Sequence, residues 1–193
     1  MLGCAVRRPA LGRFCLALCV AALARPALAQ QQPSTVTTVI LVRHAERAGD
    51  AASDPVLSPA GDVRAQALAH ALAFTRLTGI VTTQARRTQL TAAPTAQAAH
   101  LTPVVVPTGT PAHPRAVADT VRSRFAGGTV LVVGHSNTVA GIVRALGGPQ
   151  LPDLCDTEFA TLFVLTLRAG AEPSLVRSRY GPEDPPPGAA CLR

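Results

Sequence analysis

The sequence predicts an α/β protein with three layers, in which a mostly parallel central sheet lies between two layers of helices. Two observations predict this fold class. Short apolar runs rich in β-branched residues alternate along the chain with segments whose apolar residues recur at helical spacing. That alternation is typical of repeated strand–helix–strand units, whose strands pair in parallel. The length of 193 residues suits one domain with a sizeable core.

The individual elements follow from these patterns. Strands are expected over residues 35–42, 79–82, 103–106, 129–133, 159–167 and 174–180. Helices are expected over residues 59–76, from about 84 to the turns around Pro94, over 115–125 and from about 137 to 146. The tail 181–193 is rich in proline and glycine and is expected to be irregular.

Residue chemistry predicts where several helices begin. Ser58 is the expected N-cap of the first helix, with Pro59 at its first helical position. Thr83 is the expected N-cap of the second helix, and Ser136 or Asn137 that of the fourth. The buried face of the first helix is expected to consist of Val63, Ala67, Ala71 and Phe74.

Ionisable residues follow the first expected strand directly. The apolar run 35–42 leads into Arg43, His44 and Arg47, and His135 follows the fourth expected strand in the same way. In open α/β sheets, ligands bind just outside the carboxyl ends of the strands. Guanidinium groups together with an imidazole suit an oxyanion, most obviously phosphate. The sequence therefore predicts an anion site at this edge of the sheet.

Four segments resemble, in the same order, the motifs of the histidine phosphatase (phosphoglycerate mutase-like) superfamily. Arg43–Arg47 resembles its RHG or RHA signature, and Leu57–Gly61 resembles its L-[ST]-x-x-G helix start. Thr82–Ala92 resembles its S-S-x-x-x-R-[AT]-x-x-T-A segment, and Val132–Asn137 its second-histidine motif, V-G-H. The chain looks like a small exported bacterial-type member, and the resemblance implies the phosphoglycerate mutase-like fold.

The resemblance also implies an activity, that of a metal-independent phosphoric monoester hydrolase of the histidine acid phosphatase type with a small phosphorylated substrate. His44 would be the nucleophile that forms a phosphohistidine, while Arg43, Arg47 and Arg87 would bind the phosphate oxygens. His135 would donate to the same oxygens. No metal or cofactor is expected, because the guanidinium groups supply the positive charge that phosphoryl transfer needs.

Two adjacent arginines, Arg86 and Arg87, fall in the first turn of the second expected helix. A cation opposes the helix dipole there, and a bound anion would explain the placement. Spacing alone leaves a pair of surface arginines equally plausible. The motif alignment makes Arg87 the inward residue and Arg86 its exposed neighbour.

One part of the family pattern is missing. Family members commonly place a Glu or Asp general acid after the third strand, where this chain has no carboxylate before Asp119. His113 could take the role, or Asp119 could reach the site from its helix. Some compact family members lack the acid and act on substrates with good leaving groups.

Two other functions are compatible with the same motifs. A phosphomutase would need a lid that retains the intermediate, and the short chain and its expected export oppose that reading. A non-catalytic phosphate-binding pseudoenzyme is favoured by the missing acid and opposed by the intact pair of histidines.

The first 29 residues have the pattern of a secretory signal peptide. Arg7, Arg8 and Arg13 form a basic start, an apolar run follows, and Ala27-Leu28-Ala29 fits the small-x-small rule for cleavage before Gln30. The apolar run is shorter than the roughly 20 residues of a membrane-spanning helix. The sequence therefore predicts a single domain over 30–193 that is periplasmic or secreted and has no membrane attachment after cleavage.

Removal of this segment changes the charge. Four of the 18 basic residues lie in it and none of the 11 acidic ones, so 14 basic side chains remain against 11 acidic ones. The basic character of the whole chain is then weak support for nucleic-acid binding, and no basic run interleaved with aromatic residues supports it either. The mature chain keeps two cysteines, Cys155 and Cys191, which are expected to form a disulfide in an oxidising compartment.

Overall fold

The computed structural model describes residues 1–3, 36–49 and 53–186. The expected signal peptide lies outside them from residue 4 onwards, and so does Cys191, so that signal cleavage and the Cys155–Cys191 disulfide stay predictions. Residues Pro33–Arg193 form one compact unit. No helix in the described ranges is long and apolar enough to span a membrane.

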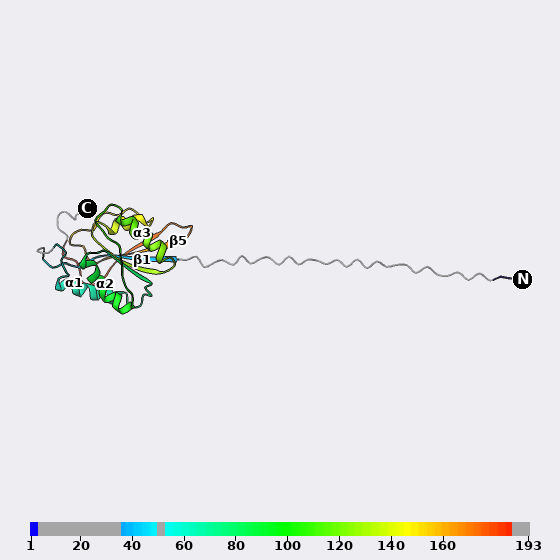
Figure 1. Ribbon diagram of the computed structural model, residues 1–193, viewed down its shortest axis with the longest axis horizontal. Coiled ribbons are helices and arrows are strands. Elements are labelled where there is room, and N and C mark those ends of the chain that lie inside the picture. Colours follow the sequence, from blue (N-terminus) through cyan, green and yellow to red (C-terminus); the bar gives the residue numbers. More distant parts are fainter. Residues whose placement is uncertain (4–35, 50–52, 187–193) are drawn as a thin grey trace. The chain divides into compact units, whose positions relative to one another are not determined.

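Strands and helices alternate through most of this unit (Figure 1). The strands are β1 (Val36–Arg43), β2 (Gly79–Thr82), β3 (Val104–Val105), β4 (Thr129–Gly134), β5 (Thr161–Arg168) and β6 (Ser174–Arg179). The helices are α1 (Pro59–Ala71), α2 (Arg86–Ala99), α3 (His113–Arg124) and α4 (Val139–Ala145). Each expected strand and helix is present, with ends that differ by a few residues.

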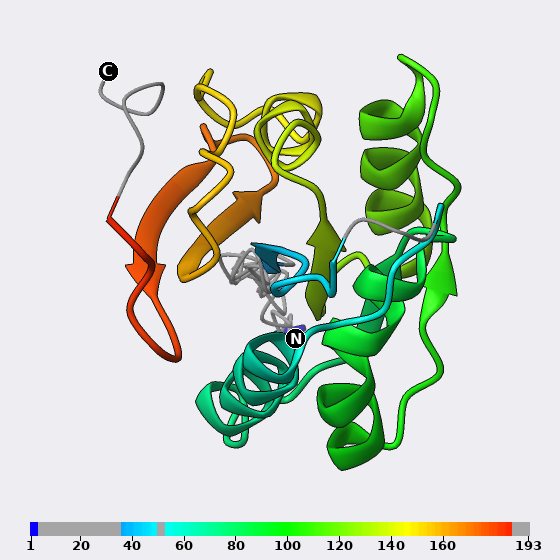
Figure 2. The ribbon, with the colours of Figure 1, turned by 90° about the vertical axis from the view of Figure 1, so that its left-hand side faces the viewer.

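The strands form one sheet in the order β3-β2-β4-β1-β5-β6 (Figure 2). β1 pairs in parallel with β4, β4 with β2, and β2 with β3. β5 and β6 are antiparallel additions, with β5 antiparallel to β1. β5 therefore begins at the edge of the sheet where β1 ends.

Two hydrophobic cores cover the two faces of this sheet. Val39 and Leu41 of β1 pack with the core under α3 and α4, while Ile40 and Val42 pack with the core under α1 and α2. This alternation follows from the two-residue period of a strand, and the unbroken apolar run reflects burial on both faces. The predicted three-layer α/β/α sandwich with a mostly parallel sheet is confirmed.

The predicted buried face of α1 is wrong. Val63 and Phe74 are 57% and 102% exposed, whereas the residues that α1 buries are Gly61, Arg64, Ala65 and Leu68. The true face is centred on an arginine, which a search for apolar periodicity passes over. The helix also ends at Ala71, before Phe74 is reached.

Two of the predicted N-caps are also wrong, whereas that of α1 is confirmed, since Ser58 Oγ accepts from the Gly61 N–H. α2 begins after Ala85, and the carboxylate of Asp54 accepts from the N–H of Arg86 at 3.1 Å. A residue remote in sequence thus replaces Thr83. α4 begins after Thr138, which follows both Ser136 and Asn137.

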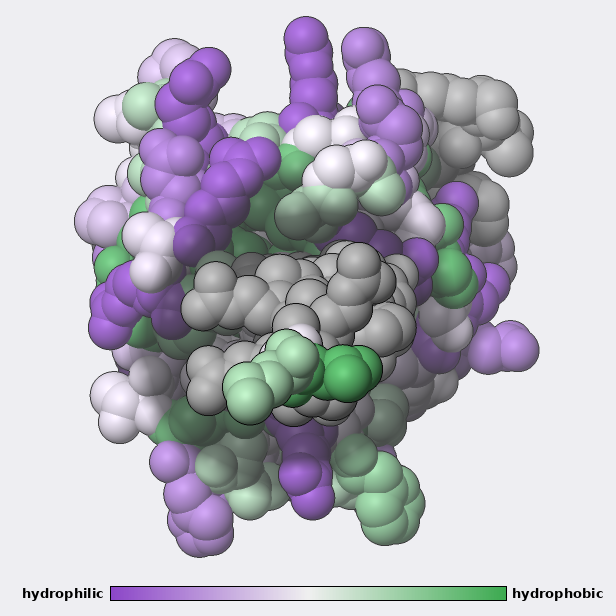
Figure 3. Space-filling model, turned by 90° about the vertical axis from the view of Figure 1, so that its right-hand side faces the viewer, coloured by the Kyte–Doolittle hydropathy of each residue, from purple (hydrophilic) through white to green (hydrophobic). Residues whose placement is uncertain are grey.

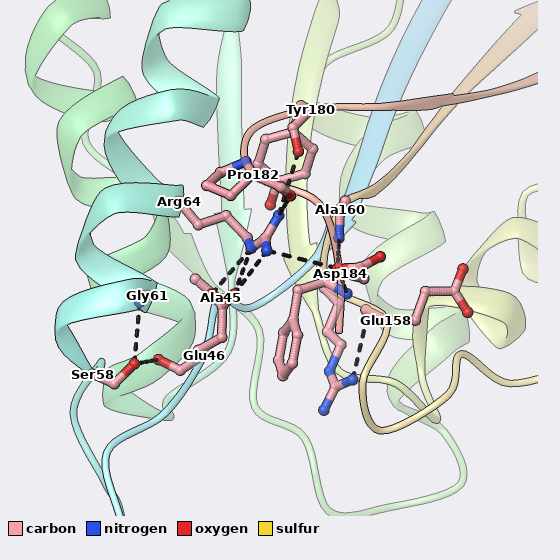
Figure 4. Close-up of polar contacts among 12 residues, drawn as sticks. Ala45, Glu46, Ser58, Gly61, Arg64, Glu158, Ala160, Tyr180, Pro182 and Asp184 are labelled. Carbon is pink, nitrogen blue, oxygen red and sulfur yellow. Dashed lines mark hydrogen bonds and ion pairs between the residues drawn. The ribbon is translucent and has the colours of Figure 1, made fainter. Parts of the chain in front are cut away.

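Arg64 is the centre of a buried ionic cluster, here named the Arg64 cluster, with Glu46 and Asp184 as its acidic members (Figure 4). The Arg64 side chain is 1% exposed, and its Nε and Nη2 donate to the Glu46 carboxylate at 2.8–3.0 Å. Its Nη1 donates to the carbonyl of Pro182 at 2.8 Å. The cluster thereby joins α1, the loop after β1 and the chain beyond β6.

The same loop approaches α1 closely at Gly61. A Cβ at this position would overlap the backbone carbonyl oxygen of Glu46. The glycine of the L-S-P-A-G segment is therefore required by packing against the loop that carries His44, and not by a left-handed backbone.

Glu46→Ala should lower the free energy of unfolding by about 3 kcal/mol, because it leaves a nearly fully buried guanidinium without its main counterion. Chemical denaturation of the purified protein measures this change. Glu172→Ala is the matched control, since it removes the same atoms from an exposed connection between β5 and β6. A loss of under about 1 kcal/mol for Glu46→Ala would contradict a stabilising role for the pair.

Candidate active site

The register of β1 and β4 places the two motif histidines side by side. Arg43 is paired with Gly134 in this parallel ladder, so the next residue of each strand, His44 and His135, emerges at the same edge. The backbone N–H of His44 donates to the carbonyl of Gly134 at 2.9 Å. The two imidazole rings lie 5.3 Å apart between centroids, in an edge-to-face arrangement.

These histidines line a pocket of about 580 Å³. The residues that line it are Arg43, His44, Arg47, Ser53, Pro55, Arg87, Thr108, Gly109, His135, Ser136, Asn137 and Asp156. All five residues expected to carry the phosphate chemistry are among them. Within the described ranges no group of three His, Cys, Asp or Glu side chains could hold a metal ion.

The hydrogen bond of His44 identifies which of its ring nitrogens can act as a nucleophile. Nδ1 lies 2.8 Å from the carbonyl oxygen of Ala45, which can only accept, so Nδ1 carries the proton. In the neutral ring Nε2 then keeps its lone pair, and it has no hydrogen-bond partner among the described residues. Burial lowers the pKa of His44 to about 3, assisted by the charges of Arg43 and Arg87. The ring is therefore neutral at physiological pH.

His135 is held in the other tautomer. Its Nδ1 accepts from Nη2 of Arg87 at 3.2 Å, since arginine can only donate. Nε2 then carries the proton and donates to Oγ1 of Thr83 at 3.1 Å. Burial lowers the pKa of His135 to about 4, with Arg87 as the next cause. Both ring nitrogens of His135 are thus engaged, one by Arg87 of α2 and the other by Thr83, which directly follows β2.

Arg43 is held in place by the connection that precedes β5. Its Nη1 donates to the backbone carbonyls of Cys155 at 2.7 Å and Asp156 at 3.0 Å. The Phe159 ring packs against the guanidinium of Arg43, with 4.2 Å between Cζ of Arg43 and the ring centroid. These contacts use one nitrogen and one face of the group, so they leave Nη2 without a hydrogen bond to the described residues.

Phe159 is in turn held by the Arg64 cluster. Oδ1 of Asp184 accepts from the backbone N–H groups of Phe159 and Ala160, both at 2.8 Å (Figure 4). The ring of Phe159 also lies 6.5 Å from that of His44 between centroids. Neither Phe159 nor Asp184 was expected at the site, and no local pattern in the sequence marks them.

The other two arginines that line the pocket are Arg47 and Arg87. Arg87 is partly buried, with 24% of its side chain exposed, while Arg86 is exposed, as the motif alignment predicts. Nη1 of Arg87 lies 3.7 Å from the carboxylate of Asp54, the residue that also caps α2. Arg47 is exposed and lines the pocket, and its backbone forms an isolated antiparallel β-bridge with Leu57.

The structure does not bring either of the expected general acids to the pocket lining. His113 is 2% exposed, its Nδ1 donates to the carbonyl of Pro107, and burial lowers its pKa, so the ring is neutral with no proton on Nε2. Asp119 lies on the exposed side of α3, where it pairs with Arg122. The carboxylate that does line the pocket is Asp156, which the sequence did not single out.

A second hollow, of about 380 Å³, lies near the opposite end of β1 and includes Thr37, Leu167 and Arg168 in its lining. Figure 3 shows the end of the molecule where β1 begins, with hydrophilic side chains projecting around patches of hydrophobic ones. Neither histidine nor acidic residues line this hollow. It therefore lacks the groups that acid–base or nucleophilic chemistry needs.

Comparison with known proteins agrees with the motifs. Residues 39–108 match the family model of the histidine phosphatase superfamily, branch 1. This range includes Arg43, His44 and Arg87 and ends before His135. No curated protein matches the chain in sequence.

Several solved structures share the fold. The protein histidine phosphatase SixA complexed with tungstate has a TM-score of 0.61 at 21% identity, over 74% of this chain and 96% of that one. The native mycobacterial glucosyl-3-phosphoglycerate phosphatase has a TM-score of 0.58 at 18% identity, over 77% and 100%. Its complex with inorganic phosphate has a TM-score of 0.53 at 18% identity, over 75% and 97%. The expected phosphoglycerate mutase-like fold is thereby confirmed.

Acid should destabilise the protein through its two site histidines. The pKa values of His44 and His135 are about 3 and about 4 in the folded protein, against 6.5 in an unfolded chain. As the pH falls from 6.5 towards 4, the unfolded chain binds protons that the folded one does not. The free energy of unfolding should therefore fall by up to about 1.4 kcal/mol per pH unit for each histidine.

Urea denaturation between pH 7 and pH 4 measures this slope. His44→Asn and His135→Asn should each reduce it, while His70→Asn, which removes an exposed ring of α1, should leave it unchanged. An undiminished slope in both site variants would show that other groups cause the acid sensitivity.

Proposed function

We propose that this protein is a phosphomonoester hydrolase that acts through a phosphohistidine on His44. One observation carries the proposal. The Nδ1–H of His44 is committed to the carbonyl of Ala45, which leaves an unprotonated Nε2 in a pocket that three guanidinium groups line. A neutral imidazole next to guanidinium groups can attack phosphorus while its neighbours bind the phosphate oxygens.

In the first half of the reaction, Nε2 of His44 attacks phosphorus and the bond to the ester oxygen breaks. Arg43, Arg47 and Arg87 bind the three outer oxygens, on which the negative charge of the transition state is spread. His135 adds an N–H donor when its Nε2–H exchanges the bond to Thr83 for one to a phosphate oxygen. The bond from Nδ1–H to Ala45 keeps the attacking tautomer in place and stabilises the ring once it carries the phosphoryl group.

In the second half, water attacks the phosphohistidine and releases inorganic phosphate, and His44 returns to its neutral form. The related proteins bind oxyanions, since SixA is complexed with tungstate and the mycobacterial phosphatase with VO₃ or inorganic phosphate, and this supports an oxyanion ligand for the present chain. For this chain we propose a small phosphorylated substrate. The positive charge comes from the protein, so turnover needs no metal ion.

A phosphate-binding protein without turnover is the second candidate. The observation that favours it is that neither His113 nor Asp119 lines the pocket. Measurement of turnover separates the two functions. We also propose that the protein is exported and acts in the periplasm or outside the cell, because residues 1–29 have the pattern of a cleavable signal peptide.

The purified mature protein should hydrolyse nitrophenyl phosphate with a chelator present, and vanadate should inhibit it by imitating five-coordinate phosphorus. His44→Ala should abolish turnover and the acid-labile phosphoenzyme, whereas His70→Ala should retain both. Loss of all wild-type activity in the chelator would contradict the histidine mechanism. Binding of phosphate without turnover would instead establish the second candidate.

Arg87→Ala should lower kcat/KM for nitrophenyl phosphate by about 10²–10³, because it removes a donor to the transferring phosphoryl group. Arg86→Ala is the matched control, since the neighbouring side chain is exposed, and its kcat/KM should stay close to that of the wild type. A larger loss for Arg86→Ala than for Arg87→Ala would place the phosphate outside this pocket.

A further inference from the structure

We propose that Asp156 is the proton donor to the leaving oxygen of the substrate. This proposal rests on the proposed phosphatase function and supplies the group that the predicted acids do not provide. It assigns the role to the connection between α4 and β5, far along the chain from the region after β3.

The topology of the sheet explains why this connection reaches the site. β5 runs antiparallel to β1, with Leu162 paired to Val42. The residues just before β5 therefore lie beside the end of β1, from which Arg43 and His44 emerge. Among the described residues that line the pocket, Asp156 is the acidic one.

The backbone of Asp156 is held in place by the site itself. Its carbonyl accepts from Nη1 of Arg43 at 3.0 Å, and the carbonyl of Cys155 accepts from the same nitrogen at 2.7 Å. Its side chain is exposed in the structure, so it has access to a bound ester. Burial lowers the pKa of Arg43, and the Asp156 carboxylate is the strongest charge that acts in the opposite direction. The carboxyl group thus lies near the guanidinium that would bind the phosphate.

The carboxylates of Asp54, Glu46 and Glu158 near the site are engaged in hydrogen bonds or ion pairs with the protein. Asp54 accepts from the Arg86 N–H and lies beside Arg87, so it fixes the start of α2. Glu46 is engaged by Arg64. Glu158 accepts from Thr161 and Arg177. For Asp156 no side-chain hydrogen bond to the described residues is present, which suits a group that must approach a substrate.

Proton transfer from Asp156 accompanies the attack by His44. Nε2 of His44 forms a bond to phosphorus while the bond from phosphorus to the ester oxygen breaks. The carboxylic acid of Asp156 gives its proton to that oxygen, so an alcohol leaves and Asp156 becomes a carboxylate. When water attacks the phosphohistidine, the carboxylate takes one of its protons and the acid is restored.

The test compares two esters in the first turnover, before hydrolysis of the phosphoenzyme can limit the rate. Glycerol phosphate has a leaving group that needs a proton, whereas nitrophenolate leaves without one. Asp156→Asn should slow release of glycerol by about 10²–10⁴, the usual contribution of a general acid, and should change release of nitrophenolate by far less. Asn keeps the backbone carbonyl that Arg43 uses, and an exposed carboxyl makes little contribution to folding.

Two matched variants separate this role from others. Asp119→Asn, on the exposed side of α3, should leave both rates unchanged. Asp54→Asn should alter both esters together, because it acts through Arg87. Asp156→Glu should restore part of the glycerol rate, since it restores a carboxylic acid.

Equal losses on the two esters for Asp156→Asn, or no loss on either, would overturn the assignment. A wild-type protein that hydrolyses neither ester and forms no phosphoenzyme would instead overturn the proposed function. The two failures are therefore distinguishable in one set of measurements.

Discussion

Two of the arginines in the described part of the chain are buried, and the need to satisfy their N–H groups shapes the region around the site. Arg43 is 6% exposed and Arg64 1%. A buried guanidinium carries five donors and a charge, each of which is costly to leave without a partner. The acceptors come from distant parts of the chain, namely the carbonyls before β5 for Arg43 and Glu46 with the segment after β6 for Arg64. Residues 181–186, the described part of the segment after β6, are therefore held by polar contacts to Arg64.

The burial that holds these groups also determines the protonation of the histidines. Burial away from water disfavours a second proton on His44 and His135, and the charges of the nearby guanidinium groups disfavour it further. A neutral His44 is what nucleophilic attack requires, and a fixed tautomer determines which nitrogen attacks. The burial that suits His44 to the proposed attack is therefore also expected to make the folded state less stable in acid. The proposed reactivity and the expected acid sensitivity thus have one physical cause.

The sequence predicted the layers, the strands and the five arginine and histidine residues that line one pocket, because these depend on local patterns. An apolar run followed by Arg43 and His44 is visible in a few adjacent residues. The buried face of α1 was not predictable in this way, since its central residue is Arg64, whose partner Glu46 lies 18 positions earlier. The start of α2 was missed for a similar reason, because its cap comes from Asp54. Asp156 belongs to the same class, since only the antiparallel pairing of β5 brings it to the pocket.

The two parts of the sheet contribute to the site in different ways. The parallel strands β2, β4 and β1 are followed directly by Thr83, His135 and His44, and the register of the strands fixes the spacing of these residues. The connection before β5 reaches the same edge without belonging to that ladder, so its side chains can differ while the histidines stay aligned. In the proposed mechanism, phosphate binding depends on the parallel strands, and protonation of the leaving group depends on the connection. A chain with no carboxylate between β3 and α3 can in this way present one to the pocket from the opposite side of β1.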